Sequence, residues 1–372
     1  SHDDIASLIF GYRETDIQGK IVNNFYGQYS QVGDFNGDGK NDFIWYNSTG
    51  TYQSALTEMN PVDLLSRIEN GWGGAAGLSY RSSRFYENES KDGGFTLPFI
   101  IPVISGVVVY DDRDNSYTNS YVYSQGYHDA EDKEFRGFGY VRSTDNEGNI
   151  SESYFLQDDI YKGKLKQQKI SDSKGILLAE TINTWSNTSP YNGTYLVNLS
   201  ESLDKSYANG VSPRQKKVTF KYDSYGNPIQ IKEWGDIALT GDERQTDTAY
   251  SYNTSSGNFL VSYPYRISVS DANGKLVSEK LLYYDNVSGN SSPPSKGLLT
   301  KENVWLYNPI TKTESRIPIT YTYDGFGNIS STTDALNRKS SIEYDANLHI
   351  FPKKVTNALN QVTSYAYDLK VG

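Results

Sequence analysis

Apolar and polar side chains alternate in short runs over the last quarter of the chain, residues 317–368. In the run 319–323 (ITYTY) the period is two, so Ile319, Tyr321 and Tyr323 share one face of a strand and two threonines occupy the other. Aromatic and β-branched residues suit a pleated, half-buried surface. No long run carries an apolar stripe at helical spacing. The pattern therefore predicts short β-strands joined by turns.

The same phrase occurs three times here: a short strand ending in Tyr-Asp, a turn, a second short strand and another turn. The tyrosines Tyr323, Tyr344 and Tyr367 lie 21 and 23 residues apart, a spacing typical of repeat architectures. Predicted turns lie at Asp324–Asn328, Asp334–Asn337 and Asn357–Asn360. Because an isolated hairpin is only marginally stable in water, these hairpins are expected to follow one another edge to edge and bury a continuous face.

Further copies of the phrase precede these three. Residues 220–227 (FKYDSYGN) match it closely, and residues 250–253 (YSYN) and 283–285 (YYD) match it more loosely. From about residue 216 onward the chain resembles the Rhs or YD-repeat family, whose repeats roll up as a spiralling β-sheet into a large hollow shell. The resemblance implies a bacterial toxin or virulence protein in which the shell encapsulates a toxin cargo.

The middle of the chain, residues 59–160, predicts strands separated by turns. Residues 64–75 are expected to form a strand and a Gly-rich turn, followed by a strand at 77–82, and a helix over 61–68 is the alternative. Further strands are expected at 107–110, 117–123 and 151–156. Farther along, the polar stretches 183–193 and 200–214 are expected to be loops.

Three phrases in this middle region resemble the toxin-complex (Tc) B components and the related plasmid virulence protein B. They are Leu97-Pro98-Phe99 with Pro102-Val103, Gly126–Asp129 (GYHD) and Glu134–Val141 (EFRGFGYV). In those proteins a propeller leads into a segment with these phrases and then into the Rhs shell. Gly137 and Gly139 would let backbone segments approach closely, and Arg136 is able to pair with a carboxylate. The segment is expected to be a buried structural corner.

The sharpest local motif is the acidic loop 34–42 (DFNGDGKND), which lies between two strand-like stretches. Oxygen donors occur at loop positions 1, 3, 5 and 9, as in the first half of an EF-hand. Trp45 stands at position 12, where an EF-hand has glutamate, so the loop is not a complete EF-hand. The alternative is an Asp- and Gly-rich turn without a metal. The expected Ca²⁺ ligands are the side chains of Asp34, Asn36, Asp38 and Asp42 and the carbonyl of Lys40.

A loop of this kind between two strands resembles the FG-GAP calcium loop of β-propeller blades, as in integrin α chains and many bacterial surface proteins. The resemblance implies a structural Ca²⁺ that cross-bridges carboxylates. A single copy cannot make a propeller, because blades come in sets of about four to eight. Residues 1–58 are therefore expected to be a propeller-like remnant, either the tail of a truncated propeller or one blade-like hairpin packed on the next domain.

Composition supports sheets and excludes several kinds of site. The 372 residues include 32 Tyr against 14 Phe, which suits sheets with a partly wet face, because a tyrosine ring can be buried with its hydroxyl in water. The chain has no Cys, which excludes disulfides and thiolate nucleophiles or ligands. The net charge of −10 argues against nucleic acid as a partner. No run approaches the roughly eighteen apolar residues of a membrane-spanning helix.

The three histidines, His2, His128 and His349, are weak candidates for a catalytic site. Asp129 follows His128, but no nucleophile elbow, paired glutamates, phosphate loop or dinucleotide fingerprint accompanies them. In the resembling families, enzymatic activity belongs to a separate C-terminal toxin domain and to a self-cleaving aspartyl protease at the end of the shell, and both would lie beyond Gly372. The chain is therefore expected to be non-enzymatic, and a hydrolase that uses His128 is the third hypothesis.

The sequence thus predicts an all-β protein of successive hairpins that form an extended curved sheet, in three regions: 1–58, 59–160 and the YD-repeat region 161–372. Because the chain stops inside a repeat, it is expected to be a fragment of a longer protein that is secreted or held on the bacterial surface. The expected partners are the rest of that chain, the toxin cargo and other toxin-complex subunits. The alternative function is an adhesin whose tyrosines and calcium-ordered loop contact a host receptor or glycan.

Overall fold

The protein is built almost wholly of strands. The structure, a computed structural model, describes residues 11–15, 21–26, 29–33, 35, 41–46, 52–55, 64–88, 96–111, 113, 115–208, 213–255 and 257–368. Among these, a single 3₁₀ turn, η1 (Ser83–Phe85), is the only helical element, and none belongs to a helix long and apolar enough to cross a membrane. The expected all-β fold is confirmed. The chain divides into two compact units, residues 1–180 and 181–372.

The first unit begins with two small sheets. Strands β1 (Gly11–Thr15) and β2 (Ile21–Tyr26) form an antiparallel hairpin. Strands β3 (Tyr29–Gly33), β4 (Asp42–Tyr46) and β5 (Tyr52–Ala55) form a three-stranded antiparallel sheet. The acidic loop therefore joins two paired strands, β3 and β4, as the sequence predicted.

The remainder of the first unit is a run of antiparallel strands, each paired with the next. Residues Arg67–Glu69 form a strand, so the alternative helix over 61–68 is wrong in its described part. The reason is that the glycine-rich turn at 70–74 reverses the chain and lets this strand pair with the next one. The strands are β6 (Arg67–Glu69), β7 (Ala75–Ser82), β8 (Pro102–Tyr110), β9 (Ser116–Asp129), β10 (Glu134–Thr144), β11 (Ile150–Phe155) and β12 (Leu165–Ser171).

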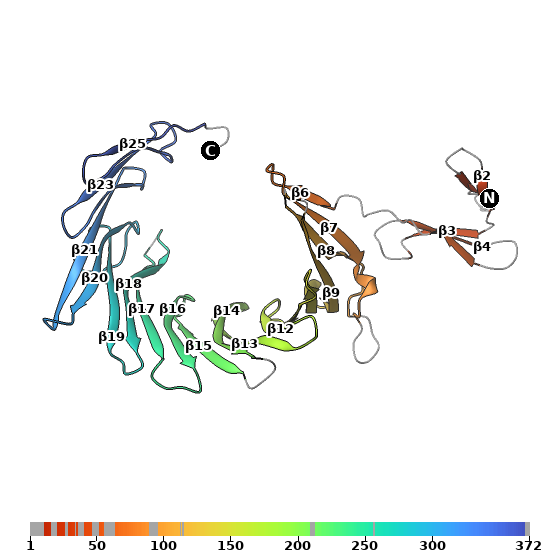
Figure 1. Cartoon of the computed structure of the whole chain (residues 1–372), viewed down its shortest axis with the longest axis horizontal. Helices are drawn as coiled ribbons and strands as arrows, with labels where there is room; N and C mark the ends of the chain where they lie inside the picture. Colours follow the sequence, from red (N-terminus) through yellow and green to blue (C-terminus); the bar gives the residue numbers. More distant parts are fainter. Residues whose placement is uncertain are drawn as a thin grey trace. The chain divides into compact units, whose positions relative to one another are not determined.

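The second unit continues in the same manner, and Figure 1 shows its strands side by side in chain order, from green to blue, as a curved strip. The strand β13 starts just before the boundary between the units. The strands are β13 (Leu177–Tyr191), β14 (Thr194–Ser206), β15 (Arg214–Tyr222), β16 (Pro228–Asp236), β17 (Arg244–Asn253), β18 (Leu260–Asp271), β19 (Leu276–Tyr284), β20 (Leu299–Asn308), β21 (Thr313–Tyr323), β22 (Ile329–Thr333), β23 (Lys339–Tyr344), β24 (Pro352–Thr356) and β25 (Val362–Ser364).

From β6 onward, strand order equals chain order, and the twenty strands β6 to β25 form one antiparallel sheet. Among the described residues, β6 pairs only with β7 and β25 pairs only with β24, so the sheet has two free edges and is not closed. The expected turns at Asp324–Asn328, Asp334–Asn337 and Asn357–Asn360 join consecutive strands, which confirms the hairpin pattern.

Two polar stretches were wrongly expected to be loops. Residues 183–191 belong to β13 and residues 200–206 belong to β14, both long strands rich in Ser, Thr and Asn. Polar side chains are tolerated on both faces of these strands because both faces are partly wet. One repeat also differs in detail, since Tyr367 lies three residues beyond the end of β25.

The sheet has almost no conventional core. Within each unit, the strands contact their neighbours in the sheet, and among the described residues no second layer of strands packs on them, although loop segments such as 96–101 and 286–297 lie against the sheet. The buried hydrophobic residues there are Ala75, Leu97, Val103, Leu282 and Tyr284. Because so little apolar surface is fully buried, hydrogen bonds in the turns and side-chain pairs between strands must contribute much of the stability of the fold.

Candidate functional site

Three sequence phrases meet at one corner of the first unit, where the segment 96–101 lies against the β9–β10 hairpin. Glycine is required there by space: a Cβ on Gly126 would lie 2.7 Å from Asn88 Oδ1 and 3.0 Å from a Leu97 methyl group. The register of β10 shifts between Phe135 and Phe138, and Gly137 in this bulge has a φ of +79°. The bulge redirects the EFRGFG side chains in the manner typical of such features.

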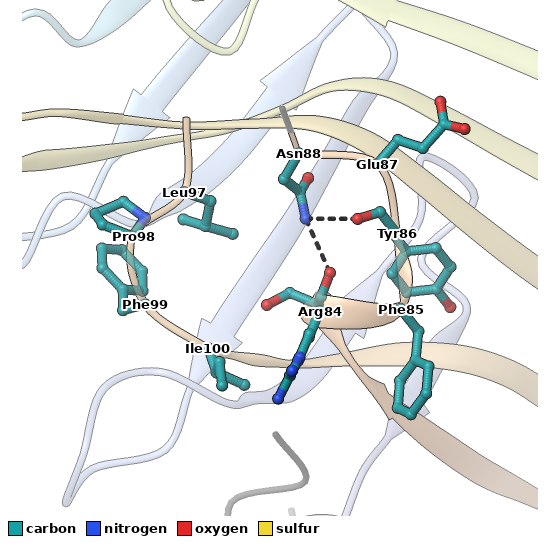
Figure 2. A pocket seen from close by; sticks show the side chains of 10 residues that line it. Arg84, Phe85, Tyr86, Glu87, Asn88, Leu97, Pro98, Phe99 and Ile100 are labelled. Atoms are coloured by element: carbon teal, nitrogen blue, oxygen red, sulfur yellow. Dashed lines mark hydrogen bonds between the residues drawn. The ribbon is translucent and has the colours of Figure 1, made fainter. Parts of the chain in front are cut away.

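Asn88 ties the corner together from a buried position. Its Nδ2 donates to the carbonyls of Ser83 at 2.8 Å and Tyr86 at 3.2 Å, the two bonds drawn in Figure 2. Its Oδ1 accepts the Gly126 N–H at 2.8 Å. The Thr96 hydroxyl adds a bond of 2.6 Å to the Gly126 carbonyl. These bonds satisfy backbone groups at the sharp turn after β7, which would otherwise be buried without partners.

An aromatic cluster lies beside Asn88 and its hydrogen bonds. The rings meet edge-on or tilted, the arrangements that the ring quadrupole favours. Burial raises the pKa of the Tyr123 hydroxyl to about 12, and this hydroxyl donates to the Ile104 carbonyl at 2.8 Å. Centroid distances along the cluster are 5.4 Å for Tyr86–Tyr123, 4.9 Å for Tyr123–Phe138, 5.8 Å for Phe138–Phe135, 5.9 Å for Phe135–Phe99 and 5.1 Å for Phe99–His128.

Arg136 lies next to this cluster with only 3% of its side chain exposed. Its guanidinium pairs with Asp129 at 3.1 Å, Asp132 at 2.8 Å and Asp159 at 2.5 Å. The Asp132 N–H and then the Arg136 charge hold the pKa of Asp129 below its ordinary value, although desolvation opposes them. The expected pairing of Arg136 with a carboxylate is confirmed, and the partner Asp129 belongs to the GYHD phrase.

A groove lies between two segments of the chain at this corner. It has a volume of about 830 Å³ and is lined by residues 83–88 and 97–100 (Figure 2). The side chains of Phe85, Phe99 and Ile100 are exposed, and the Ser83 hydroxyl accepts a bond from the Ile101 N–H. The described lining combines apolar side chains with Arg84, Glu87 and Asn88, and the amide of Asn88 is already used in backbone hydrogen bonds.

The histidines do not form a catalytic pair in the part of the chain that the structure describes. His128 packs edge-on against Phe99, while the carboxylate of Asp129 is engaged by Arg136, the N–H groups of residues 131 and 132, and the Tyr127 hydroxyl. His349 stacks on Phe326 with ring centroids 3.7 Å apart. His2 lies outside the described residues.

Of the expected calcium ligands, the structure describes one. Asp42 is 1% exposed, and its Oδ2 accepts the Phe35 N–H at 2.9 Å, which closes the loop across its two ends. Asp34, Asn36, Asp38 and Lys40 lie outside the described residues, so the ligand set stays a prediction. The acids Asp129, Asp132 and Asp159 also lie close together, but they surround the Arg136 guanidinium, which already neutralises part of their charge.

Four of the five Tyr-Asp pairs of the second unit, all but Tyr367-Asp368, have one common geometry, and sequence reasoning did not foresee its tyrosine part. The tyrosine hydroxyl donates to a backbone carbonyl on the adjacent, preceding part of the sheet, and the aspartate accepts from its own turn. These tyrosine bonds are Tyr222 to Leu199 at 2.9 Å, Tyr284 to Pro264 at 2.9 Å, Tyr323 to Leu299 at 2.7 Å and Tyr344 to Ile329 at 3.3 Å. The alternation rule places these rings on a face but says nothing of their hydroxyl partners.

The aspartate of each of these four pairs holds its turn through several N–H groups. Asp324 Oδ1 accepts the N–H groups of Phe326 and Asn328 at 2.9 Å, and its Oδ2 accepts Asn328 Nδ2 at 3.1 Å. In the longer loop after β19, Asp285 accepts four consecutive N–H groups, from residues 295 to 298. The recurring Asn four residues after Asp is the sequence signal that could have predicted the first arrangement.

Comparison with known proteins points to toxin complexes. Residues 25–168 match the family model described as the insecticide toxin TcdB middle/N-terminal region. The fold resembles crystal structures of TcdB2–TccC3 without the hypervariable C-terminal region (TM-score 0.67, 13% identity, 94% of this chain and 26% of that chain) and of TcdB2–TccC3 (0.66, 14%, 94% and 27%). It also resembles the Tc holotoxin pore of Photorhabdus luminescens (0.62, 14%, 95% and 27%).

The chain spans about a quarter of the length of these solved structures. No curated protein sequence matches it. The matched region contains the corner in which the LPF, GYHD and EFRGFG phrases meet, so the geometry and the family model concern the same residues. Residues 25–168 are thus similar to the TcdB middle/N-terminal region, and the fold of the chain is similar to that of the Tc B-component structures.

Proposed function

We propose that the chain is a structural, non-enzymatic part of a secreted bacterial toxin, a section of the β-shell wall that encapsulates a toxin polypeptide. The observation that carries this proposal is the single-layer antiparallel sheet in which strand order equals chain order. Such a sheet makes a wall rather than a compact body around a cleft. The fold likeness to TcdB2–TccC3 supports a partner chain of the TccC3 kind and a place among other toxin-complex subunits.

A single-layer sheet must stay folded without a hydrophobic core, and the hydrogen bonds of the Tyr-Asp pairs contribute to its stability. In four of the pairs the aspartate holds its own turn and the tyrosine hydroxyl donates to an earlier part of the sheet, as Tyr323 does to Leu299 at 2.7 Å. The bonds therefore join neighbouring hairpins as well as the residues within one hairpin. This arrangement supports the assignment of the second unit to the YD-repeat architecture, in which the mechanism is isolation of the cargo until delivery.

The N-terminal region belongs to the proposal as a propeller-like remnant with a structural Ca²⁺. The β3–β4 hairpin and the buried Asp42 support this part, because the predicted ligand loop lies between those two strands. A bound cation would neutralise carboxylates that otherwise repel one another within a few residues.

Protection of the cargo tests the proposal. The natural protein that contains this chain is co-expressed with a TccC3-type partner, and the complex is treated with protease while the partner's C-terminal polypeptide is followed by immunoblot. We expect that polypeptide to survive in the complex and to be degraded when the partner is expressed alone. Equal digestion in both cases would refute encapsulation.

A further inference from the structure

A second hollow lies at one end of the strands in the second unit. It has a volume of about 380 Å³ and is lined by the end of β18, the β18–β19 turn and the end of β20. Trp305 and Tyr307 are two residues apart on β20 and therefore lie on the same face. Their rings are nearly parallel, 13° apart, with centroids separated by 6.0 Å. Tyr307 is 38% exposed, so aromatic surface is open to a ligand.

An ion-pair group centred on one buried carboxylate lies beside this aromatic pair. Arg316 is the cross-strand partner of Trp305, and it pairs with Glu279, which is 3% exposed. Glu279 also pairs with Arg266 at 2.7 Å, so one carboxylate joins strands β18, β19 and β21. Trp305 Nε1 is buried without a hydrogen-bond partner among the described residues. Strand pairing and these ion pairs preorganise the site, and preorganisation reduces the entropy lost on binding.

In the turn beside the aromatic pair, one carboxylate oxygen has no hydrogen-bond partner among the residues that the structure describes. Asp271 Oδ1 accepts the N–H groups of Asn273 at 3.0 Å and Lys275 at 2.9 Å. In the related turns that begin at Asp111, Asp145, Asp223, Asp324 and Asp334, the other oxygen, Oδ2, accepts a side chain four residues later. In this turn that residue is Lys275, whose Nζ lies over the Tyr307 ring at 5.8 Å instead.

We propose that this hollow binds a neutral carbohydrate. The C–H face of a pyranose ring carries a slight positive charge and stacks on the negative face of an aromatic ring. The free oxygen of Asp271 would accept from sugar hydroxyls, and the Lys275 ammonium would donate to them. One carboxylate and one ammonium cancel in charge, which favours a neutral over an acidic sugar. The volume lies within the range of about 300–1,000 Å³ typical of small-molecule sites.

Titration calorimetry of the whole chain with maltohexaose, cellohexaose and chitohexaose tests the site. We expect saturable binding of at least one of these oligosaccharides. Tyr307→Ala should weaken it at least about tenfold, through loss of the stacking surface. Asp271→Asn should weaken it by about threefold to tenfold, through loss of the charged acceptor. Failure of all three oligosaccharides to bind would overturn the proposal, and so would binding that persists unchanged in Tyr307→Ala.

Two features of the chain keep the test independent of folding. Asn357 already starts a turn of the same type, where its Oδ1 accepts the N–H groups of Leu359 and Gln361, so Asp271→Asn preserves the turn. The matched control is Asp172→Asn, in a turn with the same two N–H bonds, at Lys174 and Ile176. It should leave binding unchanged. The inference goes beyond the proposed wall function, because Asp271→Asn should not alter protease protection of the cargo.

Discussion

Arg136 joins two phrases that are separated in the sequence. A guanidinium with 3% exposure needs carboxylate partners, because a buried charge without them is strongly destabilising. Sequence reasoning could predict a carboxylate partner for this residue. It could not select Asp132 and Asp159, since these lie in turns whose closeness to Arg136 depends on the bulge in β10.

Replacement of Arg136 by methionine tests this ion-pair group. Arg136→Met keeps a long apolar stem but leaves Asp129 and its neighbours without a cation, so we expect Tm to fall by about 5 °C or more. Arg67→Met is the control, because its pair with Glu69 is exposed on both sides and should contribute little. Scanning calorimetry of both variants makes the comparison. Equal Tm values would show that the buried group is not important for stability.

The proposed calcium loop makes a separate prediction at the scale of single residues. Excess Ca²⁺ should raise the Tm of the natural sequence, because a ligand that binds only the folded state stabilises it by mass action. Asp38→Ala should abolish this rise, since Asp38 stands at the centre of the predicted ligand set. Mg²⁺ serves as the control ion, because it requires a tighter octahedral geometry. A rise of the same size in the variant would exclude the loop as the binding site.

Among the elements, the Tyr-Asp turns explain both the success and the failure of sequence-based prediction. Alternation was enough to place β21 and β23, because those two strands carry tyrosine and isoleucine on one face. The Asn, Asp and Gly positions of the turns then placed the short strands β22 and β24 that follow them. The same reasoning missed β13 and the second half of β14, whose residues are polar on both faces. A single-layer sheet wets both faces, so a strand in it need not show an apolar stripe.

Acid should weaken the second unit through its turn aspartates. Partial burial opposes ionisation of Asp285, but four N–H groups lower its pKa overall; the Leu348 N–H and three others lower the pKa of Asp345. A folded-state pKa below the unfolded value of about 3.9 stabilises the fold above that pH. The contribution is lost as pH falls from about 4 through the lowered values.

Urea midpoints measured between neutral and acid pH test this expectation. Asp345→Asn should make stability less dependent on pH below about 4, because one titrating group is removed while an amide oxygen still accepts the N–H groups. Glu314→Gln, an exposed carboxylate on β21, is the control and should leave the profile nearly unchanged. An acid profile of Asp345→Asn identical to that of the natural sequence would mean that the turn aspartates do not govern acid stability.

At the scale of the whole molecule, the stability of each strand depends on the strands paired with it. Antiparallel hairpins in chain order mean that each strand depends on its two partners, so stability is approximately a sum of nearest-neighbour terms. The repeat spacing predicted this organisation, since hairpins joined by short turns must pair with the next strand along the chain. The sequence could not predict where the compact units divide, because no change in composition marks residue 180.

A proline in a central strand should therefore loosen its neighbours and leave distant strands intact. Thr246 on β17 is in register with Ile231 on β16 and Val269 on β18. Thr246→Pro removes a donor and forces the ring into a paired strand, so amide exchange in β16, β17 and β18 should accelerate by roughly a hundredfold. The corner at Arg136 should exchange as before, because no nearest-neighbour term connects it to β17. Thr246→Val, which suits a strand, should leave every segment unchanged. Uniform acceleration across both units in Thr246→Pro would show instead that the chain unfolds as one cooperative body.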